Sequence, residues 1–434
     1  MARDYDVVDM GQCHRREMLG ALLALSTVPC VAQKSPLERD VQQALKDARP
    51  ALTAHLKAAS RGVRSGELAL LCLAGLHDGI SPSDRLLSAA LSRLAKAKPD
   101  QTYDLALRLL VLEACATLPG RRDLAKRDLK ALLTHRSPDG AFQYGPRPST
   151  WDLSNTQYGA LGLRAASSMG LKIGSEVWSK LARTIGANQT KSGGFDYGPV
   201  RSGDDSYASM TVAGIAVLAI CQQALGARSQ TAKRIDAQLS RAWAWMADHQ
   251  EAIGSTKERS CFYFHYGLER AAILCDVVMV GGKTDWYAKG ARMLIEDQRS
   301  GGGWSSSQDV FPGSHLSNGR GDSVPTAFAV LFLRRRFQKN AGPITGSVVR
   351  LANIGPRSKP EAVEECARQL VAAGVPSMPD VLKAMRSDVG QQRQVAAKAL
   401  TAITGEGFGF DPAADREANR AAVRRAELWY LKNR

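Results

Sequence analysis

The sequence has few of the residues that mark common metal and cofactor sites. Its 434 residues include 8 Cys and 7 His, with no Cys-x-x-Cys pair and no Cys/His cluster at zinc spacing. A Walker A loop, a Gly-x-Gly-x-x-Gly turn before a helix, His-Glu-x-x-His and Gly-x-Ser-x-Gly are all missing from the sequence. We therefore expect no bound metal and no cofactor.

Long hydrophobic runs are also scarce. Beyond the N-terminus the longest apolar stretch, Met210–Cys221, is too short to span a bilayer. Basic side chains outnumber acidic ones, 58 against 42, for a net charge of +16. They are spread along helical stretches and form no Arg-rich arm, so we expect no nucleic-acid partner. Peripheral attraction to an anionic envelope surface is the most that this charge predicts.

The N-terminus has the pattern of an export signal. Arg15 and Arg16 precede a short apolar run, Leu19–Val28, and Ala32 ends a plausible cleavage site. The arginine pair resembles the twin-arginine signal, which exports folded proteins; an uncleaved amphipathic tail is the alternative. Removing residues 1–32 leaves 55 basic and 38 acidic side chains, a net charge of +17. The sequence thus predicts an exported, periplasmic protein.

Apolar residues recur at helical spacing almost everywhere, and we find no convincing strand. Gly and Pro separate the segments. The pattern predicts helices over residues 36–59, 67–77, 82–96, 103–117, 122–135, 154–169, 175–188, 205–225, 231–250, 261–280, 285–298 and 323–337.

These helices form five hairpins with one helix left over at each end. The unpaired first and last helices can pack against each other, which closes a ring of six inner and six outer helices. An open solenoid would leave an apolar face at each end, whereas closure buries both. The fold class that we predict is all-α, a six-hairpin barrel over residues 36–340.

Residues 346–434 form a second region in this prediction, with helices over 360–373, 378–386, 389–403 and 414–431. The stretch Val395–Leu400 and the turns after it resemble the end of a HEAT-type repeat. This helical HEAT-like tail either packs against the ring or binds a partner. Six cysteines remain after cleavage, and we interpret them as buried thiols, with one disulfide as an alternative.

Three segments share one frame: a polar residue, three spacers, Gly, one residue and an aromatic. The framed residues are Arg136/Gly140/Phe142, Gln189/Gly193/Phe195 and Gln298/Gly302/Trp304. The aromatics lie 53 and then 109 positions apart, which is one period followed by about two. Such spacing indicates a stacked array of equivalent units, in which each Gly permits a reversal and each aromatic packs on the next unit.

The Gln-Gly-aromatic copies resemble the QW-type repeats of the prenyltransferase and squalene cyclase superfamily, over about residues 36 to 340. The Tyr-rich stretch Cys261–Arg270 is similar to that of exported, uncharacterised bacterial proteins with cyclase repeats. This resemblance implies an α/α-toroid, with any active or binding site at the mouth and axis of the ring.

The resemblance also implies candidate catalytic residues. Class II cyclases protonate an olefin with the middle Asp of an Asp-x-Asp-Asp motif, and Asp204 and Asp205 lie at a comparable place, although Ser202 replaces the first Asp. A helix N-cap is the simpler interpretation of these two residues. Protein prenyltransferases have a zinc-binding Cys two residues after such an Asp, where this chain has Tyr207, so zinc is disfavoured.

The Tyr-rich helix carries the main candidate binding residues. Its polar-tipped stripes, expected on an inner helix, either face the axis or connect neighbouring helices at the mouth. Aromatic rings on the axis would line the path of an apolar or cationic ligand, and Arg270 would reach an anionic head group. The candidate ligand-binding residues are Trp151, Tyr158, Tyr207, Tyr263, His265, Tyr266, Glu269, Arg270 and Asp322.

Three functions stay open at this point. The first is a non-catalytic binding protein that holds an apolar or extended ligand, such as an isoprenoid, or a protein partner at the ring mouth. The second is a terpene cyclase-type enzyme with Asp204 or Asp205 as the acid. The third is a polysaccharide lyase or hydrolase, which predicts paired carboxylates or a Tyr/His/Arg set in one groove.

Overall fold

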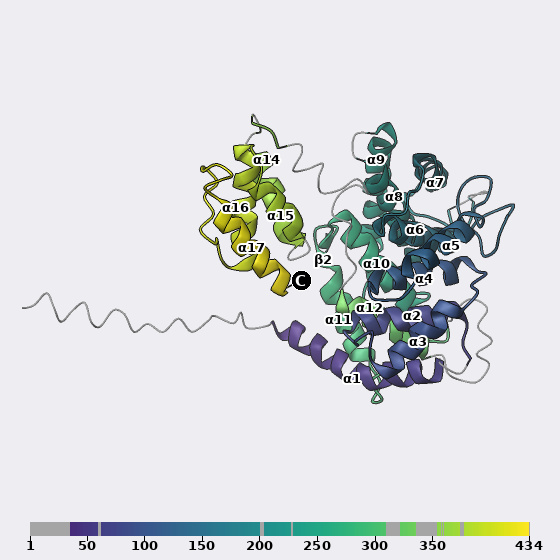
Figure 1. The fold of residues 1–434 in the computed structure, drawn as a ribbon. Coiled ribbons are helices and arrows are strands. Elements are labelled where there is room, and N and C mark those ends of the chain that lie inside the picture. The colour runs from purple at the N-terminus through teal and green to yellow at the C-terminus, as the bar shows by residue number, and fades with distance from the viewer. Residues whose placement is uncertain are drawn as a thin grey trace, which may run out of the picture.

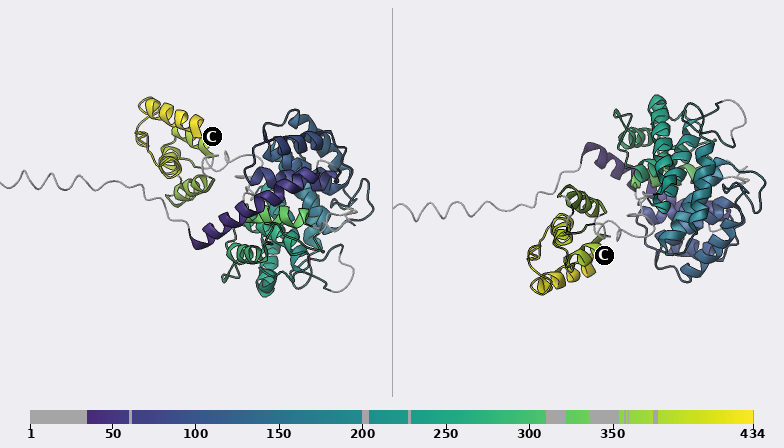
Figure 2. Two further views of the ribbon diagram at one scale, coloured as in Figure 1. Left: turned by 90° about the horizontal axis from the view of Figure 1, so that it is seen from below. Right: turned by 90° about the horizontal axis from the view of Figure 1, so that it is seen from above.

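A computed structural model describes residues 35–59, 62–199, 204–226, 229–309, 322–335, 354–356, 358, 360–373 and 377–433. Within residues 35–335 of this described part, helices form two concentric layers (Figures 1 and 2). The inner layer is α2 (Ser65–His77), α4 (Thr102–Ala114), α6 (Leu153–Ser168), α8 (Ala208–Leu225), α10 (Cys261–Cys275) and α12 (Ser323–Arg334). The outer layer is α1 (Pro36–Ala59), α3 (Arg85–Lys96), α5 (Arg121–Leu133), α7 (Ser175–Ala187), α9 (Gln230–Asp248) and α11 (Trp286–Asp297).

The inner helices make a closed circuit. Each packs against the next, and α12 packs against α2. The first helix, α1, lies against both α11 and α12, as the purple and green ribbons show in Figures 1 and 2. The predicted pairing of the first and last ring helices is therefore confirmed, and the fold is an α/α-toroid.

The apolar composition of each helix decides its layer. Every residue of α8 from Ala208 to Cys221 is buried, because neighbours surround it on all sides. In α9 the buried residues recur every three or four positions and the charged ones face outward. By length and composition α8 is the one helix in the described part that could cross a membrane, but 78% of its span is buried inside the protein.

The polar residue of the repeated frame joins consecutive outer helices. The Gln189 side-chain amide donates to the carbonyl of Gly193 (2.8 Å) and to that of Gln238 on α9 (2.8 Å). Gln298 donates in the same way to Gly302 (2.7 Å) and to Ala44 on α1 (2.8 Å). The contact that closes the ring thus repeats a contact from inside it.

The aromatic residue of the frame fixes the loop to the next inner helix. Its backbone N–H donates to a threonine hydroxyl one turn into that helix, and its ring is buried. The pairs are Phe142 with Thr156 (3.0 Å), Phe195 with Thr211 (3.2 Å) and Trp304 with Thr326 (3.0 Å). A Cβ at Gly159 or Gly214 would lie within 2.6 Å of the Phe142 or Phe195 ring, so these helices need glycine there.

Ionic contacts to the buried carboxylate of Asp78 reinforce the seam between α12 and α2. Arg334 Nε donates to Asp78 Oδ1 (2.8 Å), and Arg49 of α1 forms an ion pair with the same carboxylate (2.6 Å). At the other end of the seam, the Ser323 hydroxyl donates to Glu67 Oε1 (2.7 Å). Burial raises the pKa of Glu67, while this hydrogen bond opposes the rise.

Two helix boundaries differ most from the sequence prediction. The helix expected over 261–280 ends at Cys275, because Met279–Val280 (β1) pairs with Thr284–Asp285 (β2) in a short antiparallel hairpin that we did not foresee. The last helix begins at Arg420 and not near residue 414. Asn419 holds the preceding turns instead, since its side chain accepts from the Asp411 N–H (2.9 Å) and donates to the Asp411 carbonyl (2.7 Å).

The tail has a hydrophobic core of its own. Its helices are α14 (Pro360–Ala373), α15 (Met378–Met385), α16 (Gly390–Thr404) and α17 (Arg420–Asn433), and they pack around one cluster that includes Val381, Val395 and Leu400. The HEAT-type resemblance stays a prediction. No disulfide joins the six cysteines that the structure describes, and five of them are buried. The export signal lies outside the described residues.

Replacement of Gly302 by alanine should destabilise the contact with α1 that closes the ring. Gly302 has φ +78°, and an added Cβ would lie 1.9 Å from the Asp47 carbonyl oxygen on α1. We expect Gly302→Ala to lower the free energy of unfolding by about 3 kcal/mol, measured by urea denaturation. Gly301→Ala is the matched control, because nothing lies within 4 Å of its Cβ position. Equal stability of the two variants would contradict the role of this contact.

Candidate functional site

A cavity of about 180 Å³ opens at the end of the ring where the inner helices begin. We call it the mouth cavity. Six of the ten tyrosines of the chain line it. Its lining residues are Tyr103, Tyr144, Ser154, Tyr158, Tyr197, Tyr207, Ser209, Met210, Arg259, Ser260, Tyr263, Gln308, Asp309, Val324 and Phe328.

Closely packed aromatic rings, some stacked and some tilted, form the floor of the mouth cavity. The ring centroid of Tyr158 lies 4.3 Å from that of Tyr103 and 6.3 Å from that of Tyr263. Below them, the Tyr266 ring lies 6.2 Å from Tyr158 and 4.8 Å from Phe328. These side chains fill the axis of the ring beneath the mouth, so the site is a shallow cup.

One wall of the mouth cavity is a chain of hydroxyl groups. The Tyr144 and Tyr197 hydroxyls lie 3.2 Å apart, and the Ser154 hydroxyl lies 3.3 Å from that of Tyr197. Ser154 donates in turn to the buried carboxylate of Asp152 (2.7 Å). Burial raises the pKa of the Tyr197 hydroxyl, so it stays neutral and able to donate at ordinary pH.

Asp152 begins α6 and serves as its N-cap. Its Oδ1 accepts from the Asn155 backbone N–H (2.8 Å), and its Oδ2 accepts from the Asn155 side chain (2.8 Å). Burial raises the pKa of Asp152, and the hydrogen bonds from Asn155 and Ser154 work against that rise. The carboxyl group therefore fixes the Ser154 hydroxyl at the cavity wall.

Asp309 also lines the mouth cavity, and it caps α10 from a loop distant in sequence. Its Oδ1 accepts from the Tyr263 backbone N–H (2.8 Å) and its Oδ2 from the Ser306 hydroxyl (2.8 Å). The residue before the helix, Ser260, has φ +51° and does not cap it with its own side chain. Burial raises the pKa of Asp309, and the two donors oppose the rise.

Arg259 adds a positive charge at the rim. Its guanidinium lies 5.3 Å from the centroid of the Tyr207 ring, and the side chain is exposed. The mouth cavity therefore combines aromatic faces, hydroxyl groups, one buried carboxyl group and one exposed cation.

The structure divides the candidate binding residues into three sets. Tyr158, Tyr207 and Tyr263 line the mouth cavity, whereas Trp151 is buried beside it and Asp322 lies half-exposed at the start of α12, 3.9 Å from Arg299. Tyr266, His265, Glu269 and Arg270 lie deeper and are almost fully buried.

The deep set contacts a neighbouring helix through its rings, since Tyr266 packs on Phe328 and His265 on Phe332, both of α12. Arg270 pairs with Glu269, and its guanidinium lies 3.3 Å from the centroid of the Tyr266 ring. The Nε2 atom of His265 accepts from the Gly254 N–H (3.0 Å), and its Nδ1–H donates to the Cys261 carbonyl (2.6 Å). This geometry requires a neutral imidazole, and burial lowers the pKa of His265 to about 4.

The candidate acids lie in an exposed loop before α8. Asp204 accepts from the Ser192 N–H (3.2 Å) and from the Ser206 hydroxyl (2.6 Å). Partial burial acts to raise the pKa of Asp204, but these hydrogen bonds outweigh it and lower the pKa well below the usual range. Asp204 is thus held ionised, which is the opposite of what olefin protonation requires. Asp205 is exposed, and neither residue lines the mouth cavity.

Sequence reasoning missed several lining residues, notably Tyr144, Tyr197, Arg259 and Asp309. A signal for the two tyrosines was present, because each follows the frame aromatic by two positions, as in Phe142-Gln-Tyr144 and Phe195-Asp-Tyr197. No comparable signal marks Arg259 or Asp309. Among the described residues, no group of three or more His, Cys, Asp or Glu is placed to hold a metal ion.

No protein-family model matches the chain, and no curated protein matches it either. Among solved structures it is similar to the type II terpene cyclase MstE from Scytonema, with 17% identity and a TM-score of 0.41 over 69% of this chain and 98% of that one. It is also similar to possible GH105-family members from Salmonella enterica (11% identity, TM-score 0.48, 71% of this chain and 97% of that one) and Klebsiella pneumoniae (13%, 0.47, 71% and 96%). These likenesses concern the fold and assign no activity.

The neutral state of His265 should make stability depend on pH. Its folded pKa of about 4 lies below the unfolded value of 6.5, so the unfolded chain takes up a proton first as the pH falls. This histidine should therefore cost the fold up to about 3 kcal/mol between pH 6.5 and pH 4, and nothing above that window. Urea denaturation of the wild type and His265→Gln at several pH values measures the difference. Parallel pH profiles would contradict the assignment.

Proposed function

We propose that the protein binds a polyhydroxylated ring, such as one sugar unit of an extended carbohydrate, in the mouth cavity. The observation that carries the proposal is the gathering of six tyrosines at one small opening, where the hydroxyls of Tyr144, Tyr197 and Ser154 form a chain. Tyrosine offers an apolar face for stacking and a hydroxyl that donates and accepts hydrogen bonds. A sugar ring presents the complementary apolar faces and hydroxyl groups.

The size of the mouth cavity supports a small ring over an isoprenoid. Drug-sized ligands usually occupy about 300 to 1,000 Å³, whereas this cavity has about 180 Å³. An isoprenoid chain would need the axis of the ring, which Tyr158, Tyr266 and Phe328 fill. An extended carbohydrate needs only one unit in the cup, with its other units outside. The cation Arg259 at the rim suits a sugar that carries a carboxylate.

Terpene cyclisation receives less support from the site. The acid it requires would be Asp204 or Asp205, and these residues lie outside the mouth cavity in an exposed loop. Because the pKa of Asp204 is low, its carboxyl group is deprotonated and has no proton to donate. We therefore favour carbohydrate recognition over both an isoprenoid ligand and isoprenoid chemistry.

Removal of two tyrosine hydroxyls should distinguish a polar ligand from an apolar one. We expect the double variant Tyr144→Phe, Tyr197→Phe to bind roughly tenfold more weakly than wild type, because each lost hydrogen bond is worth about 0.5 to 1.5 kcal/mol. The measurement is calorimetric titration with gluco-, xylo- and galacturono-oligosaccharides. Tyr430→Phe in the tail is the control. Unchanged affinity in the double variant, or binding of polyprenyl phosphates with no oligosaccharide binding, would overturn the proposal.

Cleavage of the bound chain is a second candidate, and one observation favours it. Asp309 lines the mouth cavity with a carboxyl group whose pKa burial raises, and such a group can protonate a glycosidic oxygen. The hydrogen bonds from Tyr263 and Ser306 favour the ionised form and so limit this role.

Asp309→Asn tests this second function. Asparagine keeps an oxygen for the Tyr263 N–H, so the variant should fold, while acid catalysis should fall by about 10² to 10⁴. Release of reducing ends from the oligosaccharide that binds best is the measurement. If the wild type releases none, the protein is a binding protein only. If the wild type is active and the variant equals it, Asp309 is not the acid.

A further inference from the structure

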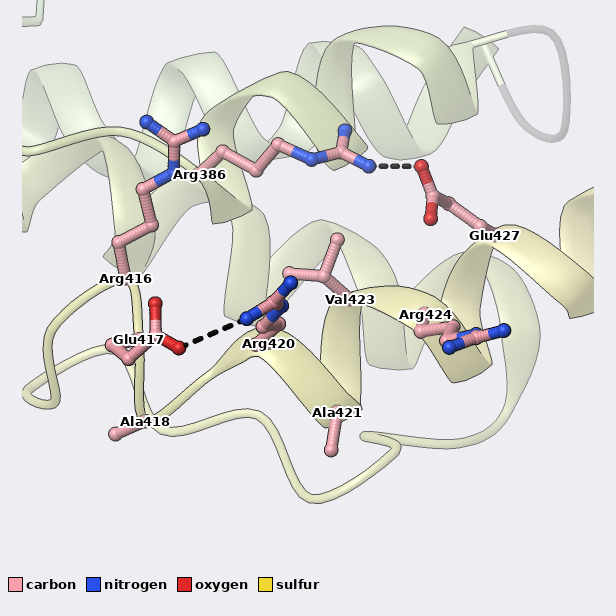
Figure 3. Close-up of a pocket in the computed structure, with 9 residues that line it drawn as sticks. All are labelled: Arg386, Arg416, Glu417, Ala418, Arg420, Ala421, Val423, Arg424 and Glu427. Atoms are coloured by element: carbon pink, nitrogen blue, oxygen red, sulfur yellow. Dashed lines mark hydrogen bonds and ion pairs between the residues drawn. The ribbon is translucent and has the colours of Figure 1, made fainter.

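Arginine side chains gather on the tail, far along the chain from the mouth cavity. An open groove of about 940 Å³ there is lined by Arg386, Arg416, Arg420 and Arg424, with Glu417 and Glu427 among them (Figure 3). Two of the arginines are neutralised, since Arg386 pairs with Glu427 and Arg420 with Glu417 (3.2 Å).

The positive charges of Arg416 and Arg424 are not balanced by an ion pair within the groove. The dashed contacts in Figure 3 end on Arg386 and Arg420, and no ion pair joins Arg416 or Arg424 to another described residue. The groove therefore has a net positive charge of two. Arg425, the next residue of the helix, does not line the groove; its guanidinium donates to the Phe408 carbonyl (2.7 Å).

Exposed leucines continue the same face of α17. Leu428 is 61% exposed and Leu431 is 54% exposed, and they are two of the five large hydrophobic side chains that are exposed in the described part of the chain. The spacing of Arg420, Arg424, Leu428 and Leu431 places all four on one side of a helix. The buried residues Ala422 and Ala426 lie on the opposite side, and Val423, which also lines the groove, packs against the tail core.

We propose that this face of α17, with Arg420 and Arg424 followed by Leu428 and Leu431, docks the protein on an anionic lipid bilayer together with Arg416 from the turn before the helix. A helix that has arginines and exposed leucines on one side can place the cations at lipid phosphates and the leucines among the acyl chains. A soluble polyanion such as DNA would account for the arginines but would leave the leucines in water. The net charge of the whole chain, +16, also attracts the protein to an anionic surface.

The test is co-sedimentation of the full chain with vesicles. One set contains phosphatidylglycerol and phosphatidylcholine in equal parts, and the other contains phosphatidylcholine alone. We expect binding to the anionic vesicles only, and weaker binding at high salt. Arg416→Gln with Arg424→Gln should weaken it roughly 30-fold, since each basic residue near such a surface is worth about a fivefold change in partitioning. Leu428→Ser with Leu431→Ser should weaken it by at least tenfold.

A matched control separates this face from general charge. Lys172→Gln with Lys191→Gln removes the same charge from exposed positions on the ring and should bind the vesicles as wild type does. Failure to bind anionic vesicles, equal loss in the control, or wild-type binding by the leucine variant would overturn the proposal. The last result together with DNA binding would instead identify a nucleic-acid surface. Oligosaccharide binding at the mouth is measured separately and should not change in any of these variants.

Discussion

The closure of the ring depends on how near a glycine backbone can come to a neighbouring helix. Gly302 lies so close to the Asp47 carbonyl that no side chain fits between them, and Gln298 donates to the Ala44 carbonyl one turn away. Gly193 makes the same approach to Arg241 on α9. The contact of Gln298 with α1 repeats the contact of Gln189 with α9, so the first helix of the chain packs on the last repeat in the same way as an outer helix packs on the repeat before it. Both ends of the array are thereby buried.

A closed ring of this size has a crowded axis, and that crowding limits where a ligand can bind. The aromatic side chains of Tyr158, Tyr266 and Phe328 meet on the axis, and the buried Arg270 is balanced by Glu269 and by the face of Tyr266. Buried charges of this kind are stable when they are paired. What remains is the cup at the mouth, where helix starts and loops present hydroxyl groups to solvent.

Much of the fold could be predicted because helical periodicity is local. The inner and outer helices, their alternation and the pairing of the first and last helices all follow from apolar spacing. The prediction failed at helix boundaries that are set by strand pairing or by side-chain hydrogen bonds. The helix beginning at Cys261 ends early because β1 and β2 pair, and α17 begins late because Asn419 holds the turns before it. Such hydrogen bonds leave almost no trace in periodicity.

The sequence by itself determined that this chain is a helical ring with a tyrosine-bearing inner helix, since spacing and composition decide which faces are buried. It also placed Tyr158, Tyr207 and Tyr263 among the candidate residues. Only the tertiary structure decided that Asp309 caps α10 across 46 residues, that His265 points into the core and that Asp204 is held ionised at the surface. Hydrogen-bond partners and desolvation decide the role of a titratable group, and both depend on which distant segments come together.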